Sequence, residues 1–317
     1  MKRLLPMLAL VLAISAPAPA RDATGALHTL LVPNSGLPAC VVPGDAFEIL
    51  ARTESGKISL EQGAASVSLE VRESILTGQA VRLTCDVPQG TASGAWALRV
   101  GDDVNLGAVF VLPERPQTYS LAFLSLHAGM LPDAAVLGAA AEAGAALLVV
   151  TAVQEAFAPL VPILDAAPLP VVVCPPAEGP REFARYFGPV DTGFRYGPDG
   201  FIRFSAAVGP TLEDVGGEDA ALQRWQRVLR PCRWRIGLAD RIDASMGLRR
   251  QFVLFVDAPL DYCLVRESGF APLDAPIHKT PWGRTVVGVP PTGAETPFEL
   301  VVIDDAGLRR AEAAATP

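Results

Sequence analysis

The sequence has 317 residues, of which 50% are hydrophobic and 19% charged, so its composition excludes a disordered chain and allows two ordinary hydrophobic cores. Its formal net charge of −8 at pH 7 argues against nucleic acid or an anionic membrane surface as a partner. Only three histidines are present, which limits the number of imidazole ligands for any metal centre.

The first twenty residues have the pattern of a secretory signal peptide. Lys2 and Arg3 precede an apolar run at 4–16 and a small-residue Ala-Pro-Ala motif at 18–20, so we expect cleavage after residue 20. The run is shorter than the 20 or so residues that span a bilayer, which disfavours an uncleaved anchor helix. Cleavage leaves 24 basic against 34 acidic residues, a net charge of −10. We therefore expect an exported protein, periplasmic or extracellular, with no stable membrane insertion after cleavage.

Residues 22–115 contain short segments rich in β-forming residues, separated by turn clusters such as Pro43-Gly44-Asp45. The expected strands are 46–51, 66–71, 80–85, 95–100 and 108–112. Their regular spacing predicts an all-β sandwich domain, most similar to an immunoglobulin-like domain. We interpret Trp96, in the middle of an expected strand, as a core residue.

The five cysteines allow one disulfide hypothesis. Cys40 and Cys85 both fall in the first domain of a chain expected to meet an oxidising compartment, and are the candidate pair. The alternative is two separate small buried residues. Cys174, Cys232 and Cys263 lie in apolar surroundings and are interpreted as core residues rather than nucleophiles.

From Tyr119 the pattern changes to alternating strands and helices. Strands are expected at 121–125, 147–151 and 171–174, and helices at 133–146, 155–166 and 218–229. Further strands are expected at 236–238, 251–256 and 262–265, with 285–289 and 298–303 as a closing pair. The βαβαβ order predicts a parallel sheet, so residues 119–306 form an α/β domain, followed by a flexible C-terminal tail at 307–317.

Ligands of a largely parallel sheet bind at the carboxyl ends of its strands, so the residues that follow each strand are the candidates for chemistry. These are Ser125-Leu126-His127, Thr151-Ala152-Val153, Pro175–Gly179, Ala239-Asp240-Arg241 and Arg266–Gly269. Asp243–Arg250 is expected to be an irregular polar segment at the same end.

The order of these loops resembles that of the calcineurin-like metallophosphoesterases, the group that includes the purple acid phosphatases. Members share Asp-x-His after the first strand, Gly-Asp after the second, Gly-Asn-His-Asp/Glu after the third, then a single His and Gly-His-x-His. Those positions here hold, in order, Ser125-Leu126-His127, Ala152-Val153, Pro176-Ala177-Glu178-Gly179, Asp240, and Arg266-Glu267-Ser268-Gly269. The resemblance covers roughly residues 40–305. It implies an α+β sandwich of the metallo-dependent phosphatase type, with an N-terminal β-sandwich domain attached.

The resemblance also implies that the metal ligands have been replaced. Family members bind two metal ions, which activate water and hold phosphate. His127 is the one histidine at a family ligand position, because Ser replaces Asp at 125 and acids stand at 178, 240 and 267. We therefore predict no metal cofactor and assign no catalytic residue. The positions of the relict site are Ser125, His127, Glu178, Asp240, Arg266 and Glu267.

The three acids of this set allow an alternative, a Mg²⁺ or Ca²⁺ site built from oxygens. Without a cation, carboxylates meeting at one point would repel each other by about 4 kcal/mol per pair at 4 Å and an effective dielectric constant of 20. Arginines that are near them in sequence are Arg181, Arg241 and Arg266. Ion pairs with these arginines are favoured over a new metal site.

Three functions follow from this interpretation. The first is an exported pseudoenzyme, a phosphoesterase scaffold that serves as a binding or structural module for an unknown protein or small-molecule ligand. The second is a residual metal-dependent phosphoester hydrolase with a remodelled site around His127. The third is an adhesive role led by residues 22–115, with the second domain as a spacer.

Overall fold

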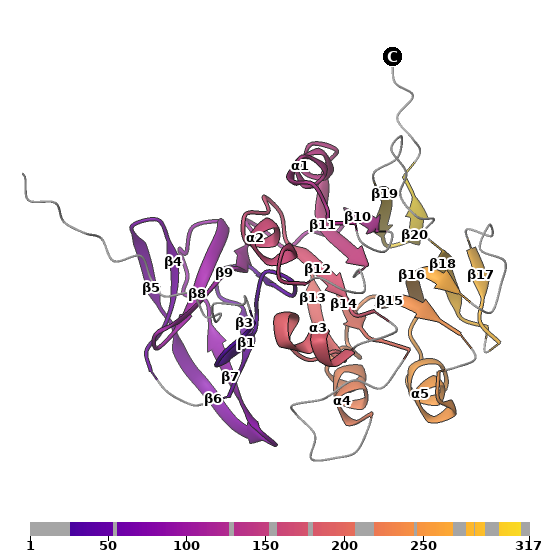
Figure 1. The fold of residues 1–317 in the computed structure, drawn as a ribbon, viewed down its shortest axis with the longest axis horizontal. Coiled ribbons are helices and arrows are strands. Elements are labelled where there is room, and N and C mark those ends of the chain that lie inside the picture. Colours follow the sequence, from indigo (N-terminus) through magenta and orange to yellow (C-terminus); the bar gives the residue numbers. More distant parts are fainter. Residues whose placement is uncertain are drawn as a thin grey trace, which may run out of the picture.

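In the computed structural model, the structure describes residues 26–52, 56–126, 130–151, 157–176, 180–206, 219–243, 246–268, 277–281, 283–288 and 298–311. The predicted signal peptide lies outside these residues. Figure 1 shows an all-strand N-terminal part beside a larger part in which helices flank β sheets. Among the described helices, none is both long and apolar enough to cross a membrane.

The N-terminal part consists of two β sheets whose inner faces share one hydrophobic core. One sheet has the order β1 (Leu30–Val32), β3 (Ala46–Ala51), β7 (Ala80–Asp86), β6 (Glu70–Thr77). The other has the order β2 (Ala39–Val41), β9 (Asp103–Val111), β8 (Gly94–Val100), β4 (Ile58–Gln62), β5 (Ala65–Ser68). Phe47 and Leu83 from the first sheet meet Trp96 and Val109 from the second. Trp96 is 2% exposed, which confirms its prediction as a core residue.

The expected strand at 66–71 is divided between the two sheets. β5 ends at Ser68 in one sheet, and β6 begins at Glu70 in the other. Between them, the Leu69 N–H donates to the Ile58 carbonyl at 2.9 Å. The change of sheet at one residue was not predicted, because both halves have the same alternating pattern.

The predicted disulfide is wrong: Cys40 and Cys85 are both free thiols in the structure. Cys85 lies in the core between the two sheets of the N-terminal part. Cys40 instead packs towards the core of the second part. The two side chains therefore point to different hydrophobic cores, a geometry that does not allow a bond.

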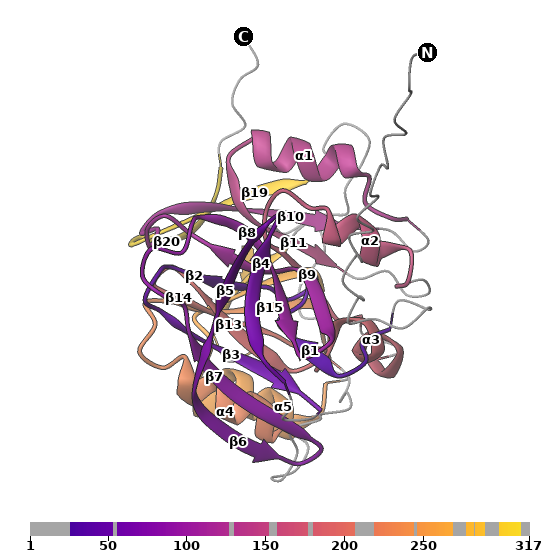
Figure 2. The same ribbon diagram turned by 90° about the vertical axis from the view of Figure 1, so that its left-hand side faces the viewer.

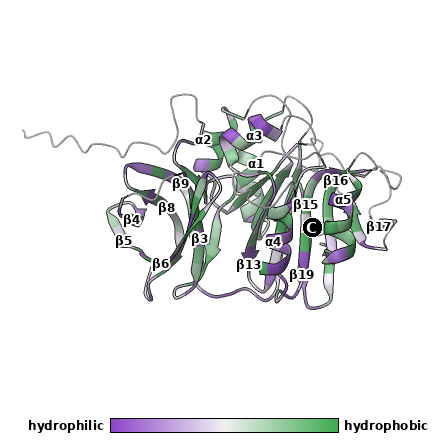
Figure 3. Cartoon of the chain, turned by 90° about the horizontal axis from the view of Figure 1, so that it is seen from below, coloured by the Kyte–Doolittle hydropathy of each residue, from purple (hydrophilic) through white to green (hydrophobic). Residues whose placement is uncertain are grey.

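The second part contains two further sheets packed face to face. The first α/β sheet has the order β12 (Val171–Cys174), β11 (Ala145–Thr151), β10 (Tyr119–Ser125), β19 (Glu299–Asp304), β20 (Gly307–Arg310). The second α/β sheet has the order β13 (Thr192–Tyr196), β14 (Asp199–Arg203), β15 (Arg235–Ile242), β16 (Tyr262–Ser268), β18 (Thr285–Gly288), β17 (Ile277–Lys279). β10, β11 and β12 are parallel to one another, as predicted, and so are β14, β15, β16 and β18. Figure 3 shows hydrophobic residues along the strands of both sheets.

Helices cover the two outer faces, so that this part has four layers (Figure 2). The first α/β sheet is covered by α1 (Ala134–Glu142), α2 (Leu160–Asp165) and α3 (Pro180–Phe187). The second is covered by α4 (Ala220–Val228), α5 (Leu248–Phe252) and the π-helical turn η1 (Val253–Asp257). Helix α1 begins after Asp133, whose carboxylate accepts a hydrogen bond of 3.0 Å from the Ala135 N–H.

Three expectations for the later elements are wrong. Residues 251–256 are helical instead of a strand, and Val253, Leu254 and Phe255 are buried in the core under the second α/β sheet. β18 and β19 do not pair with each other: β18 pairs with β16, and β19 with β10. The expected flexible tail begins with β20, which pairs with β19 from Gly307 to Arg310.

The N-terminal segment before β2 belongs to both parts of the molecule. Leu37 is 1% exposed in the core between the two α/β sheets. The Gly36 carbonyl accepts a hydrogen bond of 2.9 Å from the Val173 N–H on β12, and the Leu27 N–H donates to the Arg185 carbonyl at 2.7 Å. Residues that precede the linker predicted at 115–119 therefore also contact the second part of the molecule.

Candidate functional site at the carboxyl ends of the strands

Six strands of the second part carry a polar or small side chain at or within two residues of their carboxyl end, and we call this set the polar layer. Its members, one from each strand, are Ser125, Thr151, Cys174, Arg203, Asp240 and Arg266. Each lies two residues after a hydrophobic residue of the core between the α/β sheets, for example Phe123 before Ser125. Because side chains alternate along a strand, all six face the seam between the sheets. This is the end at which a sheet of this kind binds ligands.

Asp240 and Arg266 form the charged pair of the polar layer. The Arg266 Nε donates to Asp240 Oδ1 at 2.7 Å, and Nη2 donates to Oδ2 at 3.1 Å. The side chain of Asp240 is 4% exposed and that of Arg266 is 23% exposed. A carboxylate held by two parallel N–H donors is a strong, oriented ion pair. The ion-pair interpretation of the sequence therefore applies to Asp240.

Arg203 is the most buried charge of the layer, with a relative exposure of 0%. Its guanidinium donates to the carbonyls of Gly36 and Val173 at 3.1 Å, of Phe187 at 2.5 Å and of Pro189 at 2.9 Å. Burial lowers the pKa of Arg203 to about 9. These four bonds join the N-terminal segment, β12 and the turn after α3, so Arg203 anchors backbone.

The side chains of Thr151 and Ser125 are also buried. The Thr151 hydroxyl accepts from the Leu126 N–H at 3.3 Å and donates to the Leu124 carbonyl at 3.5 Å, which links β11 to β10. Ser125 is 0% exposed. Burial raises the pKa of the Cys174 thiol, an effect opposed by the charge of Arg203 and supported by that of Asp240. None of these three side chains is a solvent-accessible nucleophile.

The other predicted site residues are placed only in part. His127 and Glu178 lie outside the described residues, and Glu267 is placed opposite Arg241 in the strand register without a described side chain. Arg241 pairs with Asp243 at 2.6 Å. Within the described ranges, no three His, Cys, Asp or Glu side chains come close enough to hold a metal ion. The alternative of an oxygen-built site from Glu178, Asp240 and Glu267 is therefore not tested by the described residues.

A second buried charge cluster was missed by the sequence interpretation. Arg250, 1% exposed, donates to the Ser205 carbonyl at 2.8 Å, to Asp219 Oδ1 at 3.1 Å and to Asp191. Burial raises the pKa of Asp191, and the charge of Arg250 opposes this shift. The cluster joins α5 to the residues before α4 and β13. Asp243–Arg250 was expected to be irregular, but its last three residues belong to helix α5, which begins at Leu248. The sequence does not distinguish the buried Arg250 from the adjacent Arg249, whose side chain is 62% exposed.

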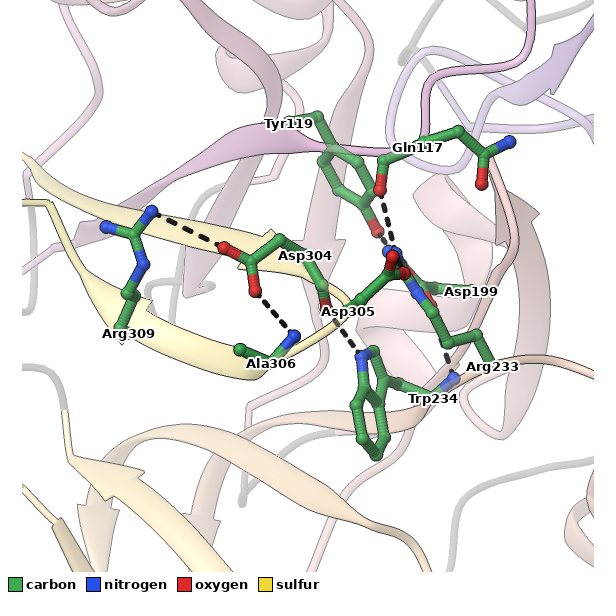
Figure 4. Close-up of polar contacts among 9 residues, drawn as sticks. All are labelled: Gln117, Tyr119, Asp199, Arg233, Trp234, Asp304, Asp305, Ala306 and Arg309. Carbon is green, nitrogen blue, oxygen red and sulfur yellow. Dashed lines mark hydrogen bonds and ion pairs between the residues drawn. The ribbon is translucent and has the colours of Figure 1, made fainter.

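A third network lies at the opposite, amino-terminal ends of the strands (Figure 4). Asp199, 0% exposed, accepts hydrogen bonds from the Tyr119 hydroxyl at 3.0 Å and from the Arg233 guanidinium at 2.9 and 2.7 Å. Arg233 also donates to the Gln117 carbonyl at 2.8 Å and pairs with Asp305 at 2.5 Å. Since Tyr119 and Asp199 begin strands of different α/β sheets, this network joins the sheets at the end remote from the polar layer.

No family model matches the sequence, and no curated protein matches it. Among solved structures, the chain is similar to one described as "Structure of PhoD", with a TM-score of 0.47 and 9% sequence identity over 95% of this chain and 94% of that chain.

Proposed function

We propose that this protein is an exported binding or structural module, with the layered architecture of a metallophosphoesterase but without its pair of metal ions. The observation that carries the proposal is the Asp240–Arg266 pair. Asp240 stands where the resembling family has a histidine ligand, and both of its carboxylate oxygens accept from one guanidinium. A carboxylate engaged in this way does not offer its oxygens to a cation unless the arginine moves away.

The charges around the pair support the same proposal. The polar layer contains two guanidinium groups, those of Arg203 and Arg266, and one carboxylate, that of Asp240. Two positive charges in a largely buried layer oppose the entry of a divalent cation at low effective dielectric constant. The layer therefore fits a structural role at the base of the strand-end loops.

Elemental analysis of the purified, untagged mature protein tests this proposal. We expect Fe, Mn and Zn each to be far below one equivalent per chain. Addition of Mg²⁺, Ca²⁺ or Mn²⁺ should leave the melting temperature unchanged, because an ion that binds the folded state raises it. Two bound equivalents of transition metal, or a chelator-reversible rise in melting temperature, would contradict the proposal.

Matched variants distinguish a lost site from a remodelled one. Phosphoester cleavage that is present in the wild type and disappears in His127→Ala would favour the residual hydrolase instead. His28→Ala is the control, because His28 lies in the N-terminal part and its side chain is 72% exposed. Cleavage that is unchanged in both variants would show that His127 is not required and would contradict a residual hydrolase built around it.

Export and the N-terminal domain class belong to the same proposal. The sequence of residues 1–20 supports export, and the two packed sheets of residues 30–111 support an immunoglobulin-like sandwich. N-terminal sequencing of protein recovered from the periplasm or medium should begin at Arg21. Recovery of the full-length chain from the cytoplasm alone would contradict export.

A further inference from the structure

A cavity of about 300 Å³ lies between the N-terminal sheet of β3 and β7 and the second α/β sheet with its helix α4. Its walls come from β2, β3 and β7 on one side and from β13 and α4 on the other. The cavity is distinct from the polar layer and from the relict-site positions. Pockets between domains are common sites for small molecules, and this volume is within their usual range.

The interior of the cavity is largely apolar. Pro38, Ala39 and Phe194 line it, together with Trp225 and Val228 from α4. The position of Trp225 requires a glycine at residue 193, because a Cβ there would lie 2.7 Å from the indole ring. The φ angle of Gly193 is not positive, so the requirement is for space and not for an unusual backbone conformation. Gly193 therefore allows the indole to approach the backbone of β13 closely and form one wall.

Charged side chains at the cavity are predominantly positive. Among the described residues that line it, Arg82 and Arg195 carry positive charge and Glu48 carries the negative charge. Glu48 is shared: Arg224 binds its two oxygens at 2.6 and 2.5 Å, and the Nε of Arg82 lies 3.7 Å away. The guanidinium of Arg224 also lies over the Trp225 ring, 4.5 Å from its centroid. Two guanidinium groups thus lie at the one carboxylate of the cavity wall, and the Arg195 guanidinium, which donates to the Val228 carbonyl at 2.8 Å, adds a third positive charge to the cavity.

This surplus of positive charge is local, because the whole chain has a net charge of −8. Arg82 and Arg224 are only 13% and 16% exposed in their side chains, so solvent screens them less than surface arginines. An anionic group at the edge of the cavity would gain charge-assisted hydrogen bonds, and an apolar body would fill the interior.

We propose that the interdomain cavity binds small amphipathic anions: molecules with an apolar body and one carboxylate or phosphate-type head group. Phe194 and Trp225 enclose the apolar body, and Arg82 and Arg195 interact with the anionic group. Glu48 competes with the ligand for the same cations. The proposal does not depend on whether the relict site holds metal, because the two sites share no residue.

Calorimetric titration of the full-length mature protein tests this directly with three probes of the same chain length. Decanoate, 1-decanol and decyltrimethylammonium, each below its micelle concentration, have negative, neutral and positive head groups. We expect decanoate to bind at least about tenfold more tightly than decanol, as one charge-assisted hydrogen bond provides. The cationic probe should bind most weakly. Equal affinity for all three, or no decanoate binding, would overturn the proposal.

Charge variants make the test specific. Arg82→Gln and Arg195→Gln should each weaken decanoate about tenfold while leaving decanol unchanged. Glu48→Gln should strengthen decanoate, because it removes the competing carboxylate. Arg72→Gln is the matched control, since Arg72 pairs with Asp86 on the same part of the molecule and does not line the cavity. Melting temperatures verify folding. If Glu48→Gln weakens decanoate in a variant that melts like the wild type, the proposal is wrong.

Discussion

Asp240 and Arg266 lie side by side on the neighbouring parallel strands β15 and β16, joined by two hydrogen bonds of 2.7 and 3.1 Å. Both face the seam between the α/β sheets, directly beyond the hydrophobic residues Leu238 and Leu264. The pair therefore closes the core at its carboxyl end. Such a buried ion pair contributes little net free energy to folding, because burying the two charges costs about as much as their attraction gains. Removing one partner is costly, because it leaves the other charge buried without a counter-charge.

Removal of both partners should therefore destabilise the protein less than the two single removals added together. We expect Arg266→Gln to lower the free energy of unfolding by about 2 kcal/mol, a value reduced for the partial exposure of Arg266. The double variant Asp240→Asn/Arg266→Gln should lose less than the sum of the single variants. Urea denaturation of all four proteins gives the coupling energy. A coupling energy of zero would show that the pair has no energetic role.

Arg203 should be more important for stability than any surface arginine. Arg203→Leu removes four hydrogen bonds to buried carbonyls, of which the Gly36 carbonyl keeps the Val173 N–H as a donor, so we expect a loss of about 3 kcal/mol or more. Arg203→Lys keeps the charge but offers one ammonium group, and should recover only part of the loss. Arg72→Gln, which changes an exposed pair, provides the comparison and should stay within about 1 kcal/mol of the wild type. A wild-type melting curve for Arg203→Leu would contradict this role.

Tyr119 should make stability depend on alkaline pH. Burial raises its pKa above the ordinary value of 10.0, and the charge of Asp199 adds to the shift. The folded state therefore keeps the proton where the unfolded chain loses it, so stability is full below about pH 10 and falls as pH rises further. The urea midpoint of the wild type should decrease from pH 9 to pH 11, and Tyr119→Phe should decrease less. Parallel pH curves for the two proteins would contradict this assignment.

All five cysteines should be free thiols in the purified protein. Alkylation of the unfolded chain without reductant should add five groups, as measured by intact mass. In the folded protein Cys85, Cys174 and Cys263 should react slowly, because they are buried and burial raises the pKa of each thiol, to about 11 for Cys85 and about 12 for Cys263. Modification of only three cysteines in the unfolded chain would indicate a disulfide.

The β10–α1–β11–α2–β12 unit was predictable because its signals are local. Apolar runs such as Leu147–Thr151 are buried on both faces, which is typical of parallel strands, and Asp133 provides a cap for the helix between them. The helix at residues 248–257 was not predictable in the same way. Its run of Phe and Val residues fits either a strand or a helix, and only packing against the second α/β sheet decides between them.

The candidate site was predicted at the level of residue types but not of partners. Arg241 and Arg266 were both expected to neutralise nearby acids. In the structure Arg266 forms an ion pair with Asp240, whereas Arg241 forms one with Asp243. Arg203 was missed because its acceptors are backbone carbonyls, one of which is 167 residues away in the sequence. Such long-range contacts leave no trace in local periodicity or spacing.

The double attachment of Gly36 has a mechanical consequence. Its carbonyl accepts hydrogen bonds from both the Val173 N–H and the Arg203 guanidinium. The segment that precedes β2 is therefore bonded to the second part of the molecule, although most strands of the N-terminal part follow it in the sequence. A hinge at the linker near residue 116 would have to break these bonds in order to open. The molecule should consequently move as one rigid block, and an excised N-terminal fragment would lose the two hydrogen bonds that the Gly36 carbonyl accepts from the second part.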